Sequence, residues 1–157
     1  MASSLPSGAE PAVPSADAPV RAAPTPNTST PEVTVLVCSS CRRAGDGPET
    51  PRPGSRLADA LAAALGADRR ADPGVTVRRV ACLGNCNRGL SAAVYRTGCW
   101  TYVFGGLDEA SGGDLLDGAR LFAGSADGFM PYRGRPAALR RGLIARVPPP
   151  DLLKDLP

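Results

Sequence analysis

VTVLVCSSC at residues 33–41 and VTVRRVACLGNC at residues 75–86 share one plan, in which a run rich in β-branched residues leads into a pair of cysteines. Such runs are typical of buried strands, so we predict strands over residues 32–37 and 75–81. Each cysteine pair then lies in the loop that follows a strand. The pairs are Cys38 with Cys41 and Cys82 with Cys86.

The segment between these two strands predicts a helix over residues 56–65. Leu57, Leu61 and Leu65 recur at every fourth position, and Ser55 stands before the first turn as a candidate cap. A strand, a helix and a second strand in this order form a right-handed crossover with parallel strands. We therefore expect both cysteine pairs at the same edge of the sheet, where open α/β sheets place their ligands.

The second half of the chain predicts a hairpin and another helix. Strands over residues 90–95 and 99–104 flank a tight Arg-Thr-Gly turn. Ser111 and Asp114 resemble a capping box at the start of a helix over residues 112–123. The element order βα-β-ββ-α predicts an α/β fold, a small open mixed sheet with two helices packed against it.

Composition divides the 157 residues into one folded domain and two tails. Residues 1–31 are rich in Ala, Pro and Ser and hold few large apolar residues, so we predict a disordered tail. The domain is expected over residues 32–150, and a short tail over residues 151–157. We find neither a secretory signal nor an apolar run long enough to cross a membrane, which predicts a cytoplasmic protein.

Four thiolates at one sheet edge are the ligand set of an iron–sulfur cluster or of a four-cysteine zinc site. The chain has no histidine, which excludes imidazole ligands and bases. Gly84, Asn85 and Arg88 are expected beside the sulfurs, where Gly84 lets the backbone expose N–H groups to them. Arg42 and Arg43 lie next to the first pair and, with Arg88, would offset the negative charge of the thiolates.

CLGNC at residues 82–86, followed by a hairpin, resembles the CLGxC loop of thioredoxin-like 2Fe-2S ferredoxins and of a small subunit of respiratory NADH–quinone oxidoreductase. The runs CLGNCNRGLSAAVYRTGCWTYVFGGL at residues 82–107 and RGRPAALRRGLIARVPP at residues 133–149 resemble a bacterial family of predicted metal-binding proteins of unknown function. The resemblance implies a thioredoxin-like ferredoxin fold and a 2Fe-2S cluster on the four paired cysteines. Because some family members are encoded near cobalamin-pathway genes, it also implies a link to cobalamin or cobalt metabolism.

Two other functions fit the cysteine pattern. Two close pairs also make a structural zinc site, and the module would then bind or handle metal without electron transfer. Alternatively, Cys38 and Cys41 form the CxxC of a thiol–disulfide redox protein. Against this alternative, the Gly- and Pro-rich segment before the predicted helix would keep the helix dipole far from the thiols. The fifth cysteine, Cys99, is expected to be a small buried apolar residue.

The carboxyl-terminal segment is basic, and its arginines suggest a docking surface for an acidic redox partner, unless they simply form the solvated face of a helix over residues 137–144. A net charge of +3 and an aromatic content of 4% do not favour nucleic-acid binding. No nucleophile–base pair is visible, so the prediction is a one-electron carrier rather than an enzyme. The docking candidates are Arg133, Arg135, Arg140, Arg141 and Arg146.

Overall fold

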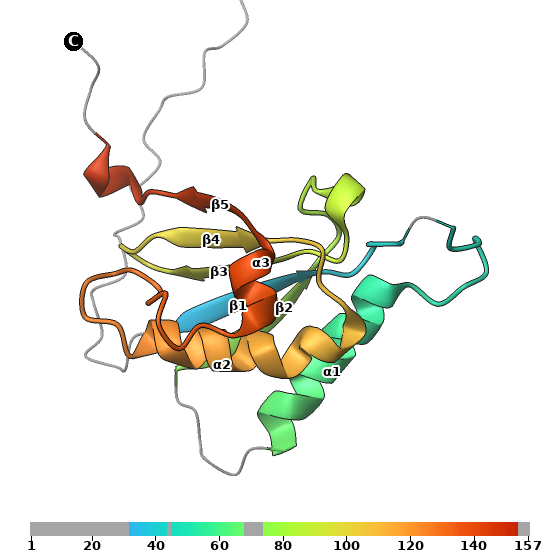
Figure 1. The fold of residues 1–157 in the computed structure, drawn as a ribbon, viewed down its shortest axis with the longest axis horizontal. Helices are drawn as coiled ribbons and strands as arrows, with labels where there is room; N and C mark the ends of the chain where they lie inside the picture. The colour runs from blue at the N-terminus through green and yellow to red at the C-terminus, as the bar shows by residue number, and fades with distance from the viewer. Residues whose placement is uncertain (1–31, 44, 68–73, 154–157) are drawn as a thin grey trace, which may run out of the picture.

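One five-stranded sheet with the order β2-β1-β3-β4-β5 organises the chain (Figure 1). The computed structural model describes residues 32–43, 45–67 and 74–153, so the tail expected over residues 1–31 lies outside the described residues. The strands are β1 (Val33–Cys38), β2 (Val75–Val80), β3 (Ala92–Arg96), β4 (Thr101–Phe104) and β5 (Leu143–Val147).

Strand direction places the two cysteine loops together. β1 and β2 are parallel, with Cys38 opposite Val80, and every other pair of neighbouring strands is antiparallel. The carboxyl ends of β1 and β2 therefore meet the amino end of β3 at one edge, as predicted. The carboxyl end of β4 and the amino end of β5 reach this same edge.

The two long helices pack side by side against the sheet (Figure 1). They are α1 (Pro53–Ala67) and α2 (Gly112–Ala123), which contact each other and β1. A third, short helix, α3 (Ala137–Arg141), contacts α2. Short 3-10 turns occupy Cys86–Arg88, Glu109–Ser111 and Pro150–Leu152. In the described part of the chain, no helix is both long and apolar enough to cross a bilayer.

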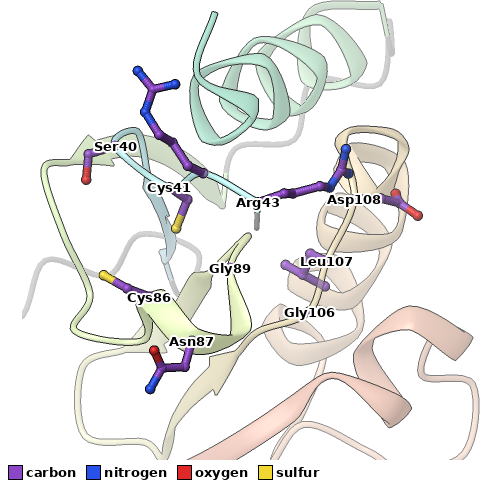
Figure 2. Close-up of a pocket in the computed structure, with 10 residues that line it drawn as sticks. Ser40, Cys41, Arg43, Cys86, Asn87, Gly89, Gly106, Leu107 and Asp108 are labelled. Atoms are coloured by element: carbon purple, nitrogen blue, oxygen red, sulfur yellow. The ribbon is translucent and has the colours of Figure 1, made fainter. Parts of the chain in front are cut away.

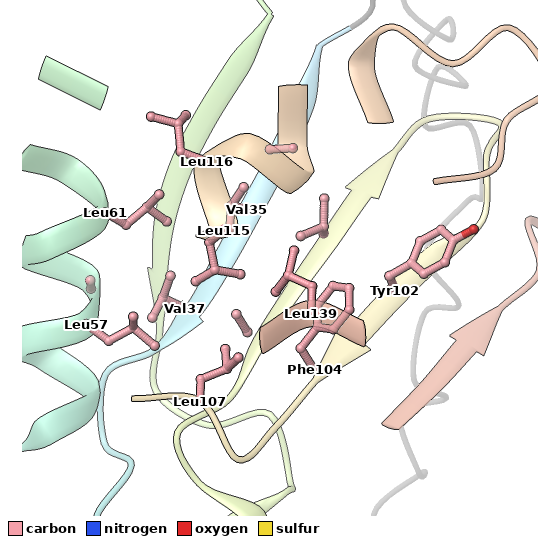
Figure 3. Close-up of a cluster of buried hydrophobic side chains, with 14 of the residues drawn as sticks. Val35, Val37, Leu57, Leu61, Tyr102, Phe104, Leu107, Leu115, Leu116 and Leu139 are labelled. Carbon is pink, nitrogen blue, oxygen red and sulfur yellow. The ribbon is translucent and has the colours of Figure 1, made fainter. Parts of the chain in front are cut away.

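The core lies between the helices and one face of the sheet (Figure 3). Alternate residues of β1 point into it, and Val35 and Val37 are fully buried. Leu57 and Leu61 of the predicted helical stripe are also fully buried, and Phe104 extends the core across β4. Full burial of one such side chain contributes about 1.5–3 kcal/mol. The domain therefore has a continuous apolar core built from protein side chains alone.

Helix α1 begins earlier than predicted, at Pro53 rather than at residue 56. Proline has no backbone N–H and a fixed φ, so it suits the first turn of a helix. Gly54 then approaches the first cysteine loop and donates its N–H to the carbonyl of Cys41 at 3.2 Å. A Cβ at position 54 would lie 2.3 Å from the carbonyl oxygen of Cys38, so only glycine fits here.

The start of α2 also differs in detail from the prediction. The capping box is formed by Asp108 and Ser111, not by Ser111 and Asp114. Ser111 Oγ lies 2.7 Å from Asp108 Oδ1 and accepts the backbone N–H of Asp108 at 3.2 Å. The box caps the 3-10 turn that leads into α2, and it therefore lies one turn earlier than the sequence suggested.

The basic carboxyl-terminal segment contains a fifth strand that the sequence did not predict. The helix expected over residues 137–144 ends at Arg141, and β5 follows at Leu143. β5 pairs antiparallel with β4, and Arg146 stands opposite Tyr102. It is the outer strand of the sheet, so this part of the segment is an edge strand rather than a solvated helix face.

Candidate metal centre

Hydrogen bonds hold the first cysteine loop against the end of β2. Ser39 donates its backbone N–H to the carbonyl of Val80 at 2.9 Å, and its hydroxyl to the same oxygen at 3.1 Å. The hydroxyl of Ser40 donates to the carbonyl of Ala81, directly before Cys82. The two serines of CSSC therefore fix this loop beside the start of the CLGNC loop.

The first cysteine pair is buried: Cys38 is 1% exposed and Cys41 is 6% exposed. Burial raises the pKa of the Cys41 thiol to about 11, and its hydrogen bond with Cys38 adds to the shift. Burial also acts to raise the pKa of Cys38, but hydrogen bonds with Cys41 and Ser40 and from the Leu83 backbone outweigh it and lower that pKa. Cys38 is thus the thiol of this pair that ionises first.

The second pair is exposed and forms its own contact. The sulfurs of Cys82 and Cys86 lie 4.0 Å apart, and the hydrogen bond between them raises the pKa of Cys86, together with the charge of Cys82. Gly84 donates its backbone N–H to the Cys82 sulfur at 3.2 Å. Its φ of +72° lies in the left-handed region, which glycine adopts without strain. The expected N–H donor is therefore present at Gly84.

One cysteine of each pair faces a common hollow between the loops. Figure 2 shows the sulfurs of Cys41 and Cys86 in this hollow, which has a volume of about 760 Å³. Gly89 lines one side of the hollow, where a Cβ would be in van der Waals contact with the Cys41 sulfur at 3.5 Å. The other lining residues are Ser40, Arg42, Arg43, Asn87, Gly106, Leu107 and Asp108.

The two pairs are neighbours, yet they do not form one closed ligand set. Among the described residues, no three Cys, Asp or Glu side chains are near enough to one another to hold a metal ion. The charge of Cys38 nevertheless contributes to the raised pKa of Cys86, so the two pairs interact electrostatically. The common edge is thus established, whereas coordination by all four cysteines stays a prediction.

In the described part of the chain, neither the Asn85 side chain nor the Arg88 side chain forms a hydrogen bond with a cysteine sulfur. The amide of Asn85 donates to the hydroxyl of Ser91 at 3.0 Å and to the carbonyl of Arg88 at 3.3 Å. It packs so closely on Gly105 that a Cβ there would clash with it at 2.1 Å. Asn85 therefore holds the loop in shape, while the side chain of Arg88 is exposed.

The two arginines beside the first pair bind protein groups. The guanidinium of Arg42 donates to three carbonyls of the following loop, those of Gly47, Pro48 and Thr50. Arg43 forms an ion pair with Glu109 at 3.2 Å. Arg42 therefore orders a loop. The charge of Arg43 is partly balanced by the Glu109 carboxylate, so it is not available to the thiols alone.

Cys99 lies away from this centre, at the turn between β3 and β4. That turn is at the opposite end of the hairpin from the cysteine loops. Cys99 is half-buried and packs beside Gly128, whose Cβ would lie 3.4 Å from its sulfur. Its position agrees with a packing role rather than with a fifth ligand.

One of the five candidate docking arginines is buried, and the other four are exposed. Arg135 is 7% exposed and donates to the carbonyls of Met130 and Pro131. It is therefore not available for docking, which corrects the prediction for this residue. Arg140 and Arg141 end α3, directly before β5 begins at the cysteine edge.

Two residues that shape the centre were not indicated by any sequence pattern. Ser91 is 1% exposed and accepts the Asn85 amide, and its hydrogen bonds with Cys41 offset part of the rise in the pKa of that thiol. Gly54 brings the amino end of α1 onto the loop, whereas the sequence placed this helix far from the thiols. A serine at a strand start and a glycine after a proline are too common to have indicated these roles.

A family model described as a protein of unknown function, DUF1636, matches residues 35–149. The chain belongs to the DUF1636 family. This match covers both cysteine pairs and the basic carboxyl-terminal segment of the DUF1636 protein. No curated protein matches its sequence at a significant level.

A solved structure with a TM-score above 0.5 shows the fold class of this chain. The DUF1636 protein is similar to a thioredoxin-like [2Fe-2S] ferredoxin from Aquifex aeolicus with a TM-score of 0.51 and 17% identity, over 78% of this chain and 99% of that chain. A wild-type structure described by the same name has a TM-score of 0.43 at 17% identity, over 73% and 98% of the two chains. The DUF1636 protein therefore has a mixed α/β, thioredoxin-like ferredoxin fold.

Proposed function

We propose that Cys38, Cys41, Cys82 and Cys86 together hold a [2Fe-2S] cluster and that the protein is a one-electron carrier. The observation that carries this proposal is the hollow that Cys41 and Cys86 line from neighbouring loops (Figure 2). The fold supports it, since the similar structure is described as a [2Fe-2S] ferredoxin. When bound, such a cluster accepts and releases one electron.

The chain's own residues would prepare this site in two ways. The exposed CLGNC loop would bring Cys82 and Cys86 toward the buried first pair, and glycine at position 84 eases that movement. The N–H of Gly84 already points at a sulfur and would stabilise it as a thiolate. Backbone N–H groups on cluster sulfurs also raise the reduction potential.

The apolar core argues against a structural zinc ion that the domain would need in order to fold. Small zinc modules fold only with metal because they lack a core. Here β1, α1 and α2 enclose fully buried Val35, Val37 and Leu57 without any metal. A four-cysteine site on such a domain is better explained by redox chemistry than by a structural need.

One observation favours the thiol–disulfide alternative, and another opposes it. The amino end of α1 touches the CSSC loop through Gly54, and the pKa of Cys38 is lowered, although burial alone would raise it. However, Cys38 is only 1% exposed, so its sulfur is closed to a disulfide substrate. We therefore prefer the cluster.

The decisive experiment is the visible spectrum of the protein purified without oxygen, before and after dithionite, with iron and sulfide assays. A red-brown protein that bleaches on reduction supports the cluster. Cys86→Ser should lose most of the colour, while Cys99→Ser, the matched control, should keep it. A colourless protein with one zinc, or a full cluster in Cys86→Ser, would refute the proposal.

An acidic redox partner would dock near Arg140 and Arg141. Gly142, the next residue, accepts the backbone N–H of Gly105 at 2.8 Å, and Gly106 lines the hollow. Neutralising both arginines should slow electron transfer and flatten its salt dependence, whereas Arg133→Ala should not. Unchanged rates in the double variant would remove this docking site. The expected link to cobalt metabolism stays a prediction.

A further inference from the structure

A second cavity, of about 490 Å³, lies between β4, β5 and the loop before α3, and it shares no lining residue with the cysteine hollow. Its volume falls within the range of about 300–1,000 Å³ found for small-molecule sites. Arg135, Leu143 and Arg146 of the basic carboxyl-terminal segment line it together with residues of β4 and of the loop before α3, and the proposed function leaves these residues mostly unused. The lining residues include Tyr102, Asp127, Phe129, Tyr132, Arg135 and Arg146.

Arg135 lies at the buried side of this cavity. It is only 7% exposed, and its guanidinium is 5.3 Å from the ring centre of Tyr102 and 5.8 Å from that of Tyr132. Its hydrogen bonds go to the main-chain carbonyls of Met130 and Pro131. Within the described residues no carboxylate forms an ion pair with it, so its charge is held by rings and carbonyls.

Arg146 brings a second positive charge to the same cavity from the exposed side. It extends from β5, and its guanidinium lies 5.2 Å from the ring centre of Trp100 and 6.0 Å from that of Phe129. Burial lowers the pKa of Arg135, and the charge of Arg146 lowers it further, so the two guanidinium groups repel each other. An anion placed between the two guanidinium groups would relieve this repulsion.

The acidic residue of the lining does not supply that anion. The carboxylate of Asp127 accepts the hydroxyl of Ser125 at 2.7 Å and the backbone N–H of Phe129 at 3.0 Å. These bonds account for the lowered pKa of Asp127. The Asp127 carboxylate therefore helps to shape the loop, and among the described residues it forms no ion pair with Arg135 or Arg146.

We propose that this cavity binds a small organic anion, whose carboxylate or phosphate group lies between Arg135 and Arg146 and whose planar apolar body packs on Phe129 and Tyr132. Guanidinium groups offer paired donors that match carboxylate and phosphate oxygens. Aromatic rings beside them favour a flat apolar ligand over a bare ion.

The single tryptophan of the chain makes the test direct. Trp100 stacks on Phe129 with ring centres 5.4 Å apart and lies under Arg146, so a ligand there should change its fluorescence. Full-length protein is titrated with benzoate, phenyl phosphate and, as the neutral counterpart, benzyl alcohol. We expect saturable binding of at least one anion and none of the alcohol, with calorimetry as an independent readout of affinity.

Variants connect the binding to the arginines. Arg146→Ala and Arg146→Gln should each weaken anion binding by about tenfold or more, since a charge-assisted hydrogen bond is lost. Arg133→Ala, an exposed arginine outside the lining, should bind as the wild type does. Binding of neither anion, equal binding of benzyl alcohol, or full affinity in both Arg146 variants would each overturn the proposal. Arg146 lies outside the cysteine centre, so these results do not depend on cluster loading.

Discussion

Replacing Gly54 by alanine tests whether α1 and the first cysteine loop are packed as tightly as described. The new Cβ would lie 2.3 Å from the carbonyl oxygen of Cys38 and 2.9 Å from Cβ of Cys41. Both atoms belong to the loop and its backbone, so neither can rotate away. Either the helix end or the loop must move, and the hydrogen bond from Gly54 to Cys41 is then strained.

Replacing glycine by alanine in a helix usually raises stability, but here we expect the replacement to lower it. Alanine in a helix is normally more stable than glycine by about 1 kcal/mol, but overpacking costs about 1–3 kcal/mol. We expect Gly54→Ala to lower the free energy of unfolding by about 1–2 kcal/mol. Because the loop carries Cys38 and Cys41, the variant should also retain less iron.

A matched control lies in the same helix. A Cβ at Gly66 would have no neighbour within 4 Å, so Gly66→Ala should be neutral or stabilising, by up to about 1 kcal/mol. Guanidinium unfolding followed by circular dichroism gives both free energies, with similar m-values expected for the two variants. A Gly54→Ala protein as stable as Gly66→Ala, with full iron content, would refute the packing argument.

Two further predictions concern charge and exposure. The hydrogen bond from Arg56 lowers the pKa of Glu109, so the bond stabilises the fold above the ordinary carboxyl pKa and the effect is lost as the pH falls through the lowered value. Glu109→Gln should therefore be less stable than the wild type at neutral pH and equally stable once the pH lies well below the lowered pKa, measured by thermal unfolding; a difference that persists in acid contradicts this. In metal-free protein, iodoacetamide should modify exposed Cys82 and Cys86 well before the two buried CSSC cysteines, and mass spectrometry showing equal rates would contradict the burial described.

The arrangement of the strands that carry cysteines could be predicted because local patterns there agree with the fold. The β-branched runs of β1 and β2 and the apolar stripe between them allow only a crossover with parallel strands. The position of the cysteine pairs at one edge follows from that topology. Gly84 could be assigned because a glycine between two cysteines is a natural N–H donor to sulfur.

The parts that escaped prediction depend on contacts distant in sequence. Leu143 and Ile144 were predicted as the end of an arginine-rich helix face, and only the pairing with β4 makes LIARV a strand. The early start of α1 depends on how closely Gly54 fits under Cys38. Arg135 looks like its exposed neighbours, and only the rings of Tyr102 and Tyr132 reveal its burial.

The central position of β1 in the sheet affects how the chain folds while it is being synthesised. Its partners are β2 on one side and β3 on the other, and α1 and α2 both pack on it. Synthesis delivers β1, α1 and β2 first, so a parallel pair can form while one edge of β1 still lacks its neighbour. Until β3 and α2 follow, β1 exposes one unpaired, strongly apolar edge, and exposed edges of this kind promote aggregation. We therefore expect the nascent chain to be most prone to aggregation before β3 and α2 have been synthesised.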